Sequence, residues 1–290
     1  MTETDFIAAL RDLADNRAAR SLTDDAAVLQ FGGEALVLTH DTLVQGVHVR
    51  EDEDPADIAW KLVAVNLSDL AAKGAEPLGV LMSHMLGEGD DRFVNGLKEV
   101  LGEYGVPLLG GDTVAAEGRR VWGCTAIGRA THASVPARSG ARPGDAVYVT
   151  GTIGRAMLGL ETGGGSDAFG LAYRRPRPRL AEGRALAPHV SAMMDVSDGL
   201  LIDSWRLGEA SGTSLHLEAN AIPVADLSRL DECLRWGDDY ELLFTLPPGV
   251  ECPVPASRIG HVAQRQGARL FLDEVPLEQP EQLGFVHRPT

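Results

Sequence analysis

The sequence predicts a two-domain protein of mixed α+β (α/β) structure. Its 290 residues suffice for two domains of ordinary size, and its content of 44% hydrophobic and 23% charged residues is that of a folded globular protein. Short apolar strands alternate with amphipathic helical segments, and a break rich in Pro, Gly and Arg occupies residues 134–145. We therefore expect an N-terminal domain over residues 1–137 and a C-terminal α/β domain over residues 138–290.

The N-terminal half alternates between strand and helix patterns, and several of these segments end in acidic residues. In chain order we expect a helix over residues 4–16, strands over 25–29 and 34–39, a helix over 55–73, a strand over 78–86, a helix over 91–104, and strands over 106–109 and 120–128. Asp25 leads into the first strand, Asp41 stands where the second ends, and a Gly-Gly-Asp turn over residues 110–112 follows the fourth. Glycines let a backbone approach phosphate closely, although such turns and acidic pairs are also ordinary surface features.

The helix over residues 55–73 has clear ends and two polar faces. Asp54 can cap it, Pro55 suits its first position, and Gly74 follows its last turn. At about 100° per residue, one face is expected to be solvated and consists of Asp57, Lys61 and Ser68. The second polar strip lies among aliphatic residues and consists of Asn66, Asp69 and Lys73.

Asp69 is the residue of that strip that most needs a partner. A carboxylate among aliphatic side chains loses hydration worth on the order of several kcal/mol unless a cation or hydrogen-bond donors replace it. One interpretation is an internal pair with Lys73, or a helix with two solvated faces. The other interpretation is that Asp69 binds a metal ion, and the helix alone does not decide between them.

The C-terminal half continues the mixed pattern without a complete nucleotide-binding fingerprint. We expect strands over residues 146–150, 191–196, 215–218 and 240–246, two later strands, and helices over residues 155–161, 200–211 and 227–234. Gly151 and Gly154 form only half of a dinucleotide motif, and no Walker-type phosphate loop occurs in the sequence. The four arginines of residues 174–179 are expected in a solvated loop, with phosphate recognition as the alternative use for one or two of them.

Charge and cysteine content exclude several classes of protein. The formal charge of −16 disfavours nucleic acid or an anionic membrane as a partner, because both need a basic surface. Acidic residues kept for solubility explain this excess, unless they cluster in short glycine-rich motifs, which would imply bound cations. Three scattered cysteines without a C-x-x-C spacing predict neither a disulfide framework nor a zinc site. The acidic start lacks the features of a signal peptide, and no apolar run reaches membrane-spanning length, so we expect a cytoplasmic protein.

Seven motifs spread over almost the whole chain resemble those of one enzyme family. They are TDDAA at residues 23–27, THDTLVQGVH at 39–48, VNLSDLAAKGA at 65–75, LGGDT at 109–113, ARSGARPGD at 137–145, DVSDGL at 195–200 and GDDYEL at 237–242. In this order they resemble the thiamine-monophosphate kinase family. That family belongs to the superfamily of aminoimidazole ribonucleotide synthetase and selenophosphate synthetase.

The resemblance implies a fold, an assembly and a reaction. It implies that the N-terminal mixed sheets of two subunits pair into a barrel, that the C-terminal α/β domain packs beside this sheet, and that nucleotide binds across the interface of a homodimer. It also implies Mg²⁺-dependent transfer of the γ-phosphate of ATP to thiamine phosphate, which gives thiamine diphosphate and ADP. Such a transfer depends on positioning and charge screening, which single aspartates on separate elements provide through several Mg²⁺ ions.

Site residues carry over from the family's motifs position by position. The metal set implied by the resemblance consists of Asp25, Thr39, His40, Asp41, Asp69, Asp112, Asp195 and Asp198. The implied nucleotide contacts are Gly111, Asp112, Arg138 and Ser197, and the implied thiamine phosphate contacts are His48, Asp238 and Phe285. We expect no general base, because the acceptor phosphate is already ionised, and we expect His48 to position that phosphate.

A few positions depart from the family pattern, and other members of the superfamily fit less well. Thr23 and Trp236 stand where the family has Gly, His40 where it has Thr, and Asp238 where it has Glu, so the departures concern substrate fit more than metal binding. A selenophosphate synthetase would carry a reactive residue near its N-terminus, a hydrogenase-maturation relative would carry a Cys-bearing tail, and an aminoimidazole ribonucleotide synthetase would lack the THDTLV and GDDYEL pair. From a different class, the alternative is a catalytically weak binder of a phosphorylated vitamin.

Overall fold

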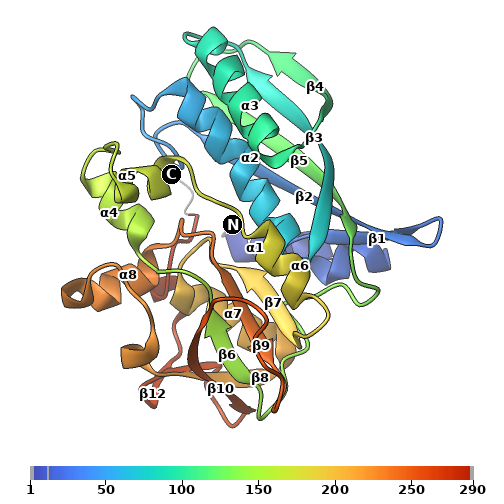
Figure 1. Ribbon diagram of the computed structural model, residues 1–290, viewed down its shortest axis with the longest axis vertical. Coiled ribbons are helices and arrows are strands. Elements are labelled where there is room, and N and C mark those ends of the chain that lie inside the picture. Colours follow the sequence, from blue (N-terminus) through green and yellow to red (C-terminus); the bar gives the residue numbers. More distant parts are fainter. Residues whose placement is uncertain (1–2, 12, 288–290) are drawn as a thin grey trace.

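Figure 1 shows the computed structural model of the chain, which describes residues 3–11 and 13–287. Two mixed sheets define two domains, so the predicted two-domain α/β fold is confirmed. The N-terminal sheet has the strand order β1-β2-β5-β3-β4, in which only β3 and β4 run parallel. The C-terminal sheet has the order β12-β11-β8-β10-β6-β9-β7, in which only β11 and β8 run parallel.

The N-terminal domain packs two long helices against its sheet. Its elements are α1 (Glu3–Arg11), η1 (Arg17–Leu22), β1 (Ala27–Phe31), β2 (Glu34–Val44), α2 (Pro55–Ala72), β3 (Ala75–Met85), α3 (Asp90–Tyr104), β4 (Leu108–Val114) and β5 (Val121–Ala130). Helix α2 lies against β2 and β5, and α3 packs on α2, in the upper half of Figure 1. The first helix ends earlier than expected, at Arg11.

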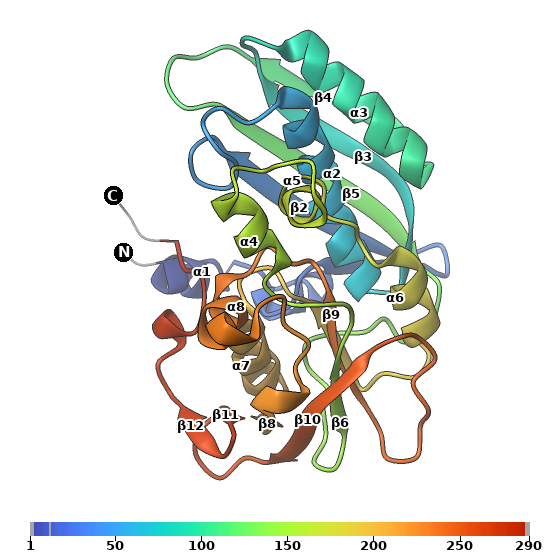
Figure 2. The same ribbon diagram turned by 60° about the vertical axis from the view of Figure 1, so that its left-hand side comes forward.

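The C-terminal domain supplies the lower half of the molecule. Its elements are β6 (Ala146–Val149), α4 (Arg155–Glu161), α5 (Ala168–Arg174), α6 (Leu180–Leu186), β7 (Ala192–Asp195), α7 (Leu200–Ser211), β8 (Thr213–Leu217), η2 (Ala219–Ala221), η3 (Leu227–Arg229), α8 (Leu230–Trp236), β9 (Leu242–Leu246), β10 (Ser257–Gln264), β11 (Leu270–Leu272), β12 (Val275–Leu277) and η4 (Pro280–Gln282). Three strands therefore follow β9, where two were expected. Helices α5 and α6 contact α2, and α4 packs against α5 (Figure 2). No helix in the described part of the chain is both long and apolar enough to cross a bilayer.

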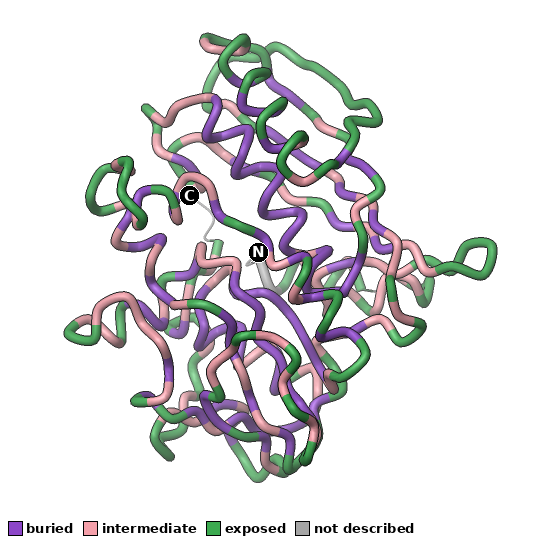
Figure 3. The backbone as a smooth tube through the Cα atoms, viewed as in Figure 1, coloured by how far each residue is buried: buried purple, intermediate pink, exposed green. Residues whose placement is uncertain are grey.

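Helix α2 is the central element, because both domains pack on it. Nearly all of its residues are buried, and Figure 3 shows it as an almost continuous buried segment through the middle of the molecule. The expectation of a solvated face made by Asp57, Lys61 and Ser68 is wrong, since all three are buried. The pattern of a surface helix assumes one covered side, whereas here the C-terminal domain covers the second side and gives each polar group a partner.

The end of α2 depends on a close contact between the domains. Gly74 follows the helix with φ 59°, a left-handed conformation that glycine adopts at little cost. A Cβ atom at this position would lie 2.4 Å from the Cβ of Ala187, which follows α6. A larger residue at position 74 would therefore push the two domains apart.

The arginine-rich segment after α5 ties the C-terminal domain to α2. Arg174 and Arg175 both form ion pairs with Asp57 in the first turn of α2. Arg179 pairs with Glu241 just before β9, with Nε to Oε2 at 2.7 Å. The expected solvated loop is therefore corrected, because three of its four arginines are held by carboxylates of the same chain.

Two strands continue further than the sequence pattern indicates. Strand β2 runs on through Asp41 to Val44, because it pairs with β5 from Leu36 to Val44. Residues 110–112 belong to strand β4 and do not form a turn. A Cβ atom on Gly111 would lie 1.9 Å from the carbonyl oxygen of Met82, so glycine lets β4 lie against β3 at this point.

One side of the N-terminal sheet and its β4 edge present apolar side chains to solvent. Strand β4 is exposed along its length. Large exposed apolar residues on and beside the sheet are Leu29, Phe31, Leu78, Leu81, Leu108, Leu109, Val114 and Val121. So many exposed apolar side chains on one sheet are unusual on an isolated monomer.

Candidate active site

A pocket of about 940 Å³ lies between the two domains beside α2. Its walls include most of the residues expected at the site: Asp25, His40, Asp41, His48, Asp69, Arg138, Asp195, Ser197, Asp198, Asp238 and Phe285. Thr39 lies behind this lining and donates a hydrogen bond to Asp69. Gly111 and Asp112 do not line the pocket of this chain.

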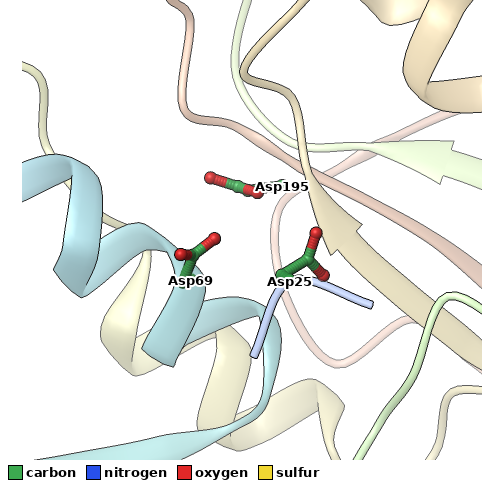
Figure 4. A group of neighbouring side chains, drawn as sticks. All are labelled: Asp25, Asp69 and Asp195. Carbon is green, nitrogen blue, oxygen red and sulfur yellow. The ribbon is translucent and has the colours of Figure 1, made fainter. Parts of the chain in front are cut away.

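Three carboxylates converge at the acidic end of the pocket (Figure 4). Asp25 precedes β1, Asp69 is in the last turn of α2, and Asp195 ends β7. One oxygen from each lies within 4.8 Å of the others, and no other such group of acids, histidines or cysteines occurs among the residues that the structure describes. Two hydroxyls orient them: Thr39 donates to Asp69, and Ser68 donates to Asp195 at 2.6 Å. Elements of both domains are therefore needed to build this cluster.

Asp25 has its own cations within the chain. The buried Lys73 ammonium lies 2.5 Å from Asp24 and 2.5 Å from Asp25, and Arg138 Nε donates to Asp25 at 2.7 Å. Burial alone would raise the pKa of Asp25, but the charges of Arg138 and Lys73 outweigh it and hold that pKa well below its usual range. The proposed internal pair between Asp69 and Lys73 is not formed, because Lys73 is engaged by the acidic pair before β1.

Three other acids of this end, Asp41, Asp69 and Asp195, have no such compensation. Burial, reinforced by the negative charge of Asp25, raises the pKa of Asp195 to about 8. Burial and the neighbouring Asp41 and Asp195 raise the pKa of Asp69 well above its ordinary value. Burial together with Asp198 and Asp25 raises the pKa of Asp41 to about 6. A site that gathers buried and half-buried carboxylates without matching cations favours an added cation strongly.

The donor set indicates which kind of cation fits. All ligand atoms offered by Asp25, Asp69 and Asp195 are carboxylate oxygens, and Thr39 and Asp41 add oxygen donors beside them. Hard cations such as Mg²⁺ prefer oxygen ligands, whereas zinc and copper sites use histidine and cysteine. The residues present therefore fit Mg²⁺.

A loop after β7 forms the wall next to the cluster. Ser197 and Asp198 both donate their backbone N–H to Asp203 in the first turn of α7, at 3.1 Å each. Asp198 forms an ion pair with Arg206, so its charge is partly balanced. Asp203 was not expected from the sequence. It is fully buried, and it fixes the two backbone amides that precede the helix.

Two side chains predicted to bind metal, those of His40 and Asp112, lie away from the carboxylate cluster. His40 is exposed, and its Nδ1 lies 2.8 Å from the hydroxyl of Thr125 on β5. Because side chains alternate along a strand, this ring lies on the sheet face opposite to Thr39 and Asp41, which leaves its backbone for a contact in the pocket. Asp112 lies opposite Ser83 on edge strand β4, and β3 and β5 separate it from β2. One chain alone therefore does not bring Asp112 to the carboxylate cluster.

His48 lies at the opposite end of the pocket, beside the C-terminal residues. Its Nδ1 accepts the backbone N–H of Val44 at 3.0 Å, which assigns the ring proton of the neutral form to Nε2. Burial and the nearby His287 lower the pKa of His48, so the ring is neutral at pH 7. Phe285 stands edge-on to it, with ring centroids 6.4 Å apart. A neutral imidazole with Nε2–H is a hydrogen-bond donor for an anionic group.

Asp238 is engaged within the chain on both of its oxygens. Its Oδ2 pairs with Lys61 of α2 at 2.5 Å, and its Oδ1 accepts from the hydroxyl of Tyr240 at 2.9 Å. The carboxylate of this implied thiamine phosphate contact is therefore already compensated by partners of the same chain. The other acids of the same motif support the fold, since Asp239 accepts the N–H of Gly154 and Glu241 binds Arg179 and Thr150.

Sequence reasoning missed the partners of Lys61 and Lys73, although the composition contains a signal for both. The chain has 26 lysines and arginines, of which only Lys61, Lys73 and Lys98 are lysines. Two of these three are buried at the pocket, whereas Lys98 is exposed on α3. The chain uses arginine at nearly all cationic positions. A lysine inside a helix with apolar neighbours was therefore a sign that its ammonium group pairs with a carboxylate elsewhere in the chain.

Comparison with known proteins agrees with this geometry. Residues 23–130 match the family model described as AIR synthase related protein, N-terminal domain, and residues 142–273 match AIR synthase related protein, C-terminal domain. A thiamine-monophosphate kinase of Caulobacter vibrioides is 36% identical over 99% of this chain and 91% of that protein. One of Salmonella typhimurium is 39% identical over 77% of this chain and 75% of that protein.

A solved structure described as AaThiL complexed with AMPPCP and TMP has the same architecture. It superimposes with a TM-score of 0.88 at 28% identity, over 99% of this chain and 97% of the other. The resemblance inferred from the seven motifs is thus confirmed by sequence over the whole chain and by fold. The chain belongs to the thiamine-monophosphate kinase family, within the AIR synthase related proteins.

Proposed function

We propose that this pocket catalyses Mg²⁺-dependent transfer of the γ-phosphate of ATP to thiamine phosphate, giving thiamine diphosphate and ADP. Family membership makes the chain a kinase, and the similar structure whose description names AMPPCP and TMP supports both substrates. The observation that carries the metal requirement is a group of carboxylates without matching cations, in which Asp195 is buried and Asp41 and Asp69 are half-buried. The acidic end would take the phosphate groups, and the end with His48 would take the acceptor.

We assign the metal-holding role to the acidic end of the pocket. The proposed ligands are Asp25, Asp41, Asp69, Asp195 and Asp198, with Thr39 and the backbone of His40 beside them. Bound Mg²⁺ supplies positive charge that screens the phosphate oxygens of donor and acceptor. Thr39 and Ser68 orient Asp69 and Asp195 through their hydroxyls, so these carboxylates are preorganised for an ion.

We assign the nucleotide and acceptor contacts to the remaining walls. Arg138 and Ser197 stand next to Asp25 and Asp195 and would contact the nucleotide. His48 would donate from Nε2 to the phosphate of the acceptor, which requires the neutral form that its surroundings favour. Asp238 and Phe285 complete that end of the pocket. No residue is needed as a general base, because the attacking phosphate oxygen is ionised at neutral pH.

We propose a homodimer in which the N-terminal sheets of two copies pair into a barrel. The exposed apolar side chains on and beside the sheet, including Leu81, Leu109 and Val114, support a second copy as the occupant of this surface. The position of Gly111 and Asp112 on the β4 edge also supports it, since pairing of two sheets would bring these residues toward nucleotide bound at the interface. Analytical ultracentrifugation tests this assembly, and a monomer at micromolar concentration would contradict it.

We also propose the domain division and the cellular location. Residues 1–137 form the dimerisation and metal-binding domain, and residues 138–290 complete the nucleotide and substrate site. The ends of the two matched family models, at residues 130 and 142, support this boundary. We place the reaction in the cytoplasm, where ATP is supplied.

A single-turnover assay tests the proposed reaction directly. Enzyme in excess is mixed with thiamine phosphate, ATP and Mg²⁺, and thiamine diphosphate and ADP are measured over time. We expect stoichiometric formation of both products, and none when EDTA replaces Mg²⁺. Saturable binding of thiamine phosphate without product would instead identify a binder of a phosphorylated vitamin and refute the kinase proposal.

A further inference from the structure

Lys61 is a buried ammonium group with three partners from three separate parts of the chain. Its side chain is 2% exposed. It donates to the backbone carbonyl of His48 at 3.2 Å, pairs with Asp238, and lies over the ring of Tyr173, 4.2 Å from the centroid. His48, Asp238 and Tyr173 all line the pocket. Lys61 therefore joins the loop after β2, the segment before β9 and helix α5 from behind the pocket wall.

The segment that carries Asp238 needs such a fixed support. Asp238 and Tyr240 have φ angles of 63° and 52°, a left-handed conformation that costs non-glycine residues on the order of 1 kcal/mol each. Gly237 precedes them with φ 91°, and a Cβ atom there would lie 2.5 Å from the carbonyl oxygen of Ser197. Backbone bonds from Asp238 to Ser197 and from Tyr240 to Val196 hold the main chain. The carboxylate is then fixed by Lys61 on one oxygen and by Tyr240 on the other.

We propose that Lys61 is a positioning residue for the acceptor substrate, acting by fixing and neutralising Asp238 at the end of the pocket next to His48. This inference rests on the proposed function, in which that end of the pocket binds thiamine phosphate. A carboxylate that pairs with an internal ammonium presents a set orientation and little net charge, so it contributes shape and hydrogen bonding to recognition. Because α2 also carries Asp69, one rigid helix sets the distance between the acceptor end and the acidic end.

Steady-state kinetics of charge-removing variants test this role. Lys61→Met should raise the KM for thiamine phosphate about tenfold while the KM for ATP stays within about twofold, because only the acceptor end loses its support. Lys98→Met is the matched control, since it removes the exposed lysine on α3, and it should change neither constant. A purely structural role for Lys61 would affect both substrates alike.

A double variant shows whether Lys61 acts through Asp238. If it does, adding Lys61→Met to Asp238→Asn should change the KM for thiamine phosphate by less than about twofold, whereas independent residues would give multiplied effects. The double variant leaves no unpaired buried charge, so it provides the measurement even where Lys61→Met alone does not fold. Equal changes in both KM values, or multiplied effects in the double variant, would overturn the inference. Failure of the proposed function is distinguishable, because the unmodified enzyme itself would then form no thiamine diphosphate.

Discussion

The carboxylates at the two ends of the pocket have opposite kinds of partners. At the acceptor end, Asp238 has an ammonium partner in Lys61 and a hydroxyl partner in Tyr240. At the acidic end, Asp69 and Asp195 are held by the hydroxyls of Thr39 and Ser68, and their pKa values are raised by burial and by neighbouring acids. Both ends are built on α2, so the difference lies in the charges supplied around the helix.

The raised pKa values at the acidic end do not result from a lack of cationic side chains nearby. Lys73 and Arg138 both lie beside it, yet both bind Asp25 and hold it ionised. The chain thus neutralises one acid of the cluster and leaves its neighbours short of positive charge. Since an uncompensated buried carboxylate costs stability, this arrangement is expected only where an external cation completes it. The acceptor end needs no such ion.

The largest effect should follow from removing a carboxylate of the acidic end. Asp69→Asn should lower kcat on the order of 10²- to 10³-fold, the size expected when one group that stabilises transition-state charge is lost. The metal-free variant should melt at the same temperature as the unmodified protein or higher, because repulsion from Asp41 and Asp195 is relieved. Steady-state kinetics and thermal melts in EDTA measure the two quantities.

The surface variant Asp91→Asn on α3 serves as the control for this experiment, since Asp91 is exposed. It should leave both kcat and the melting temperature unchanged. An Asp69→Asn protein that unfolds in EDTA but turns over normally where folded would show that Asp69 has a structural partner instead of a metal.

Adding the missing cation should stabilise the folded protein. At about 100 times the dissociation constant, Mg²⁺ with a non-hydrolysable ATP analogue should raise the free energy of unfolding by roughly 2.7 kcal/mol. Thermal melts with these ligands, compared with melts in EDTA, measure the gain. Identical midpoints would count against the carboxylate cluster as a metal site.

The pH dependence of that gain gives a second check on the same cluster. The folded pKa values of about 6 for Asp41 and about 8 for Asp195 lie above the unfolded value near 4, so the metal-free folded state binds more protons than the unfolded state. Its stability should therefore fall as pH rises from about 4 to about 8. Mg²⁺ replaces these protons, so the stabilisation by Mg²⁺ and nucleotide should be larger at pH 8 than at pH 6. An equal gain at both pH values would contradict the raised pKa values.

Acids that pair with arginines between the domains should affect the free energy of unfolding more than the rate of turnover. Asp57→Asn should lower the free energy of unfolding by about 2 kcal/mol, because Arg174 and Arg175 lose their shared charged acceptor but remain partly exposed. Urea unfolding measures the change. Glu99→Gln is a matched control, since exposed Glu99 also pairs with Arg175, and it should change stability by less than about 0.5 kcal/mol. Equal losses in the two variants would contradict the idea that Asp57 braces the domains.

Sequence patterns predicted most of the fold because local rules determine its helices and strands. The cap at Asp54, the stop at Gly74 and the strand periodicities place α2 and most of its neighbours correctly. Asp25, Asp69 and Asp195 could be singled out because each lies at or near the end of a regular element in a distinctive motif. Their convergence depends on tertiary packing, which only the resemblance to a family could anticipate.

The partners of the polar residues on α2 could not be predicted, because they depend on which surfaces the second domain covers. A helical wheel assigns Asp57, Lys61 and Ser68 to solvent, since it considers one core at a time. Their partners, Arg174, Asp238 and Asp195, are more than 100 residues away in the sequence. Asp112 is a further case, because its place on the β4 edge keeps it away from the carboxylate cluster of its own chain, and only the proposed second copy would give it a role at the site.

The smallest effect concerns Asp238 and sharpens the contrast between the two ends. Asp238→Ala should raise the KM for thiamine phosphate about tenfold with little change in kcat, because it removes ground-state binding and leaves Lys61 without its carboxylate. Asp238→Glu keeps the charge and should retain most activity, although its longer side chain must reach Lys61 from a backbone with φ 63°. Kinetics with each substrate varied in turn measure both variants. An unchanged KM for thiamine phosphate in Asp238→Ala would remove this residue from the acceptor end, whereas a fall in kcat as large as that of Asp69→Asn would mean that the two ends do not divide binding from chemistry.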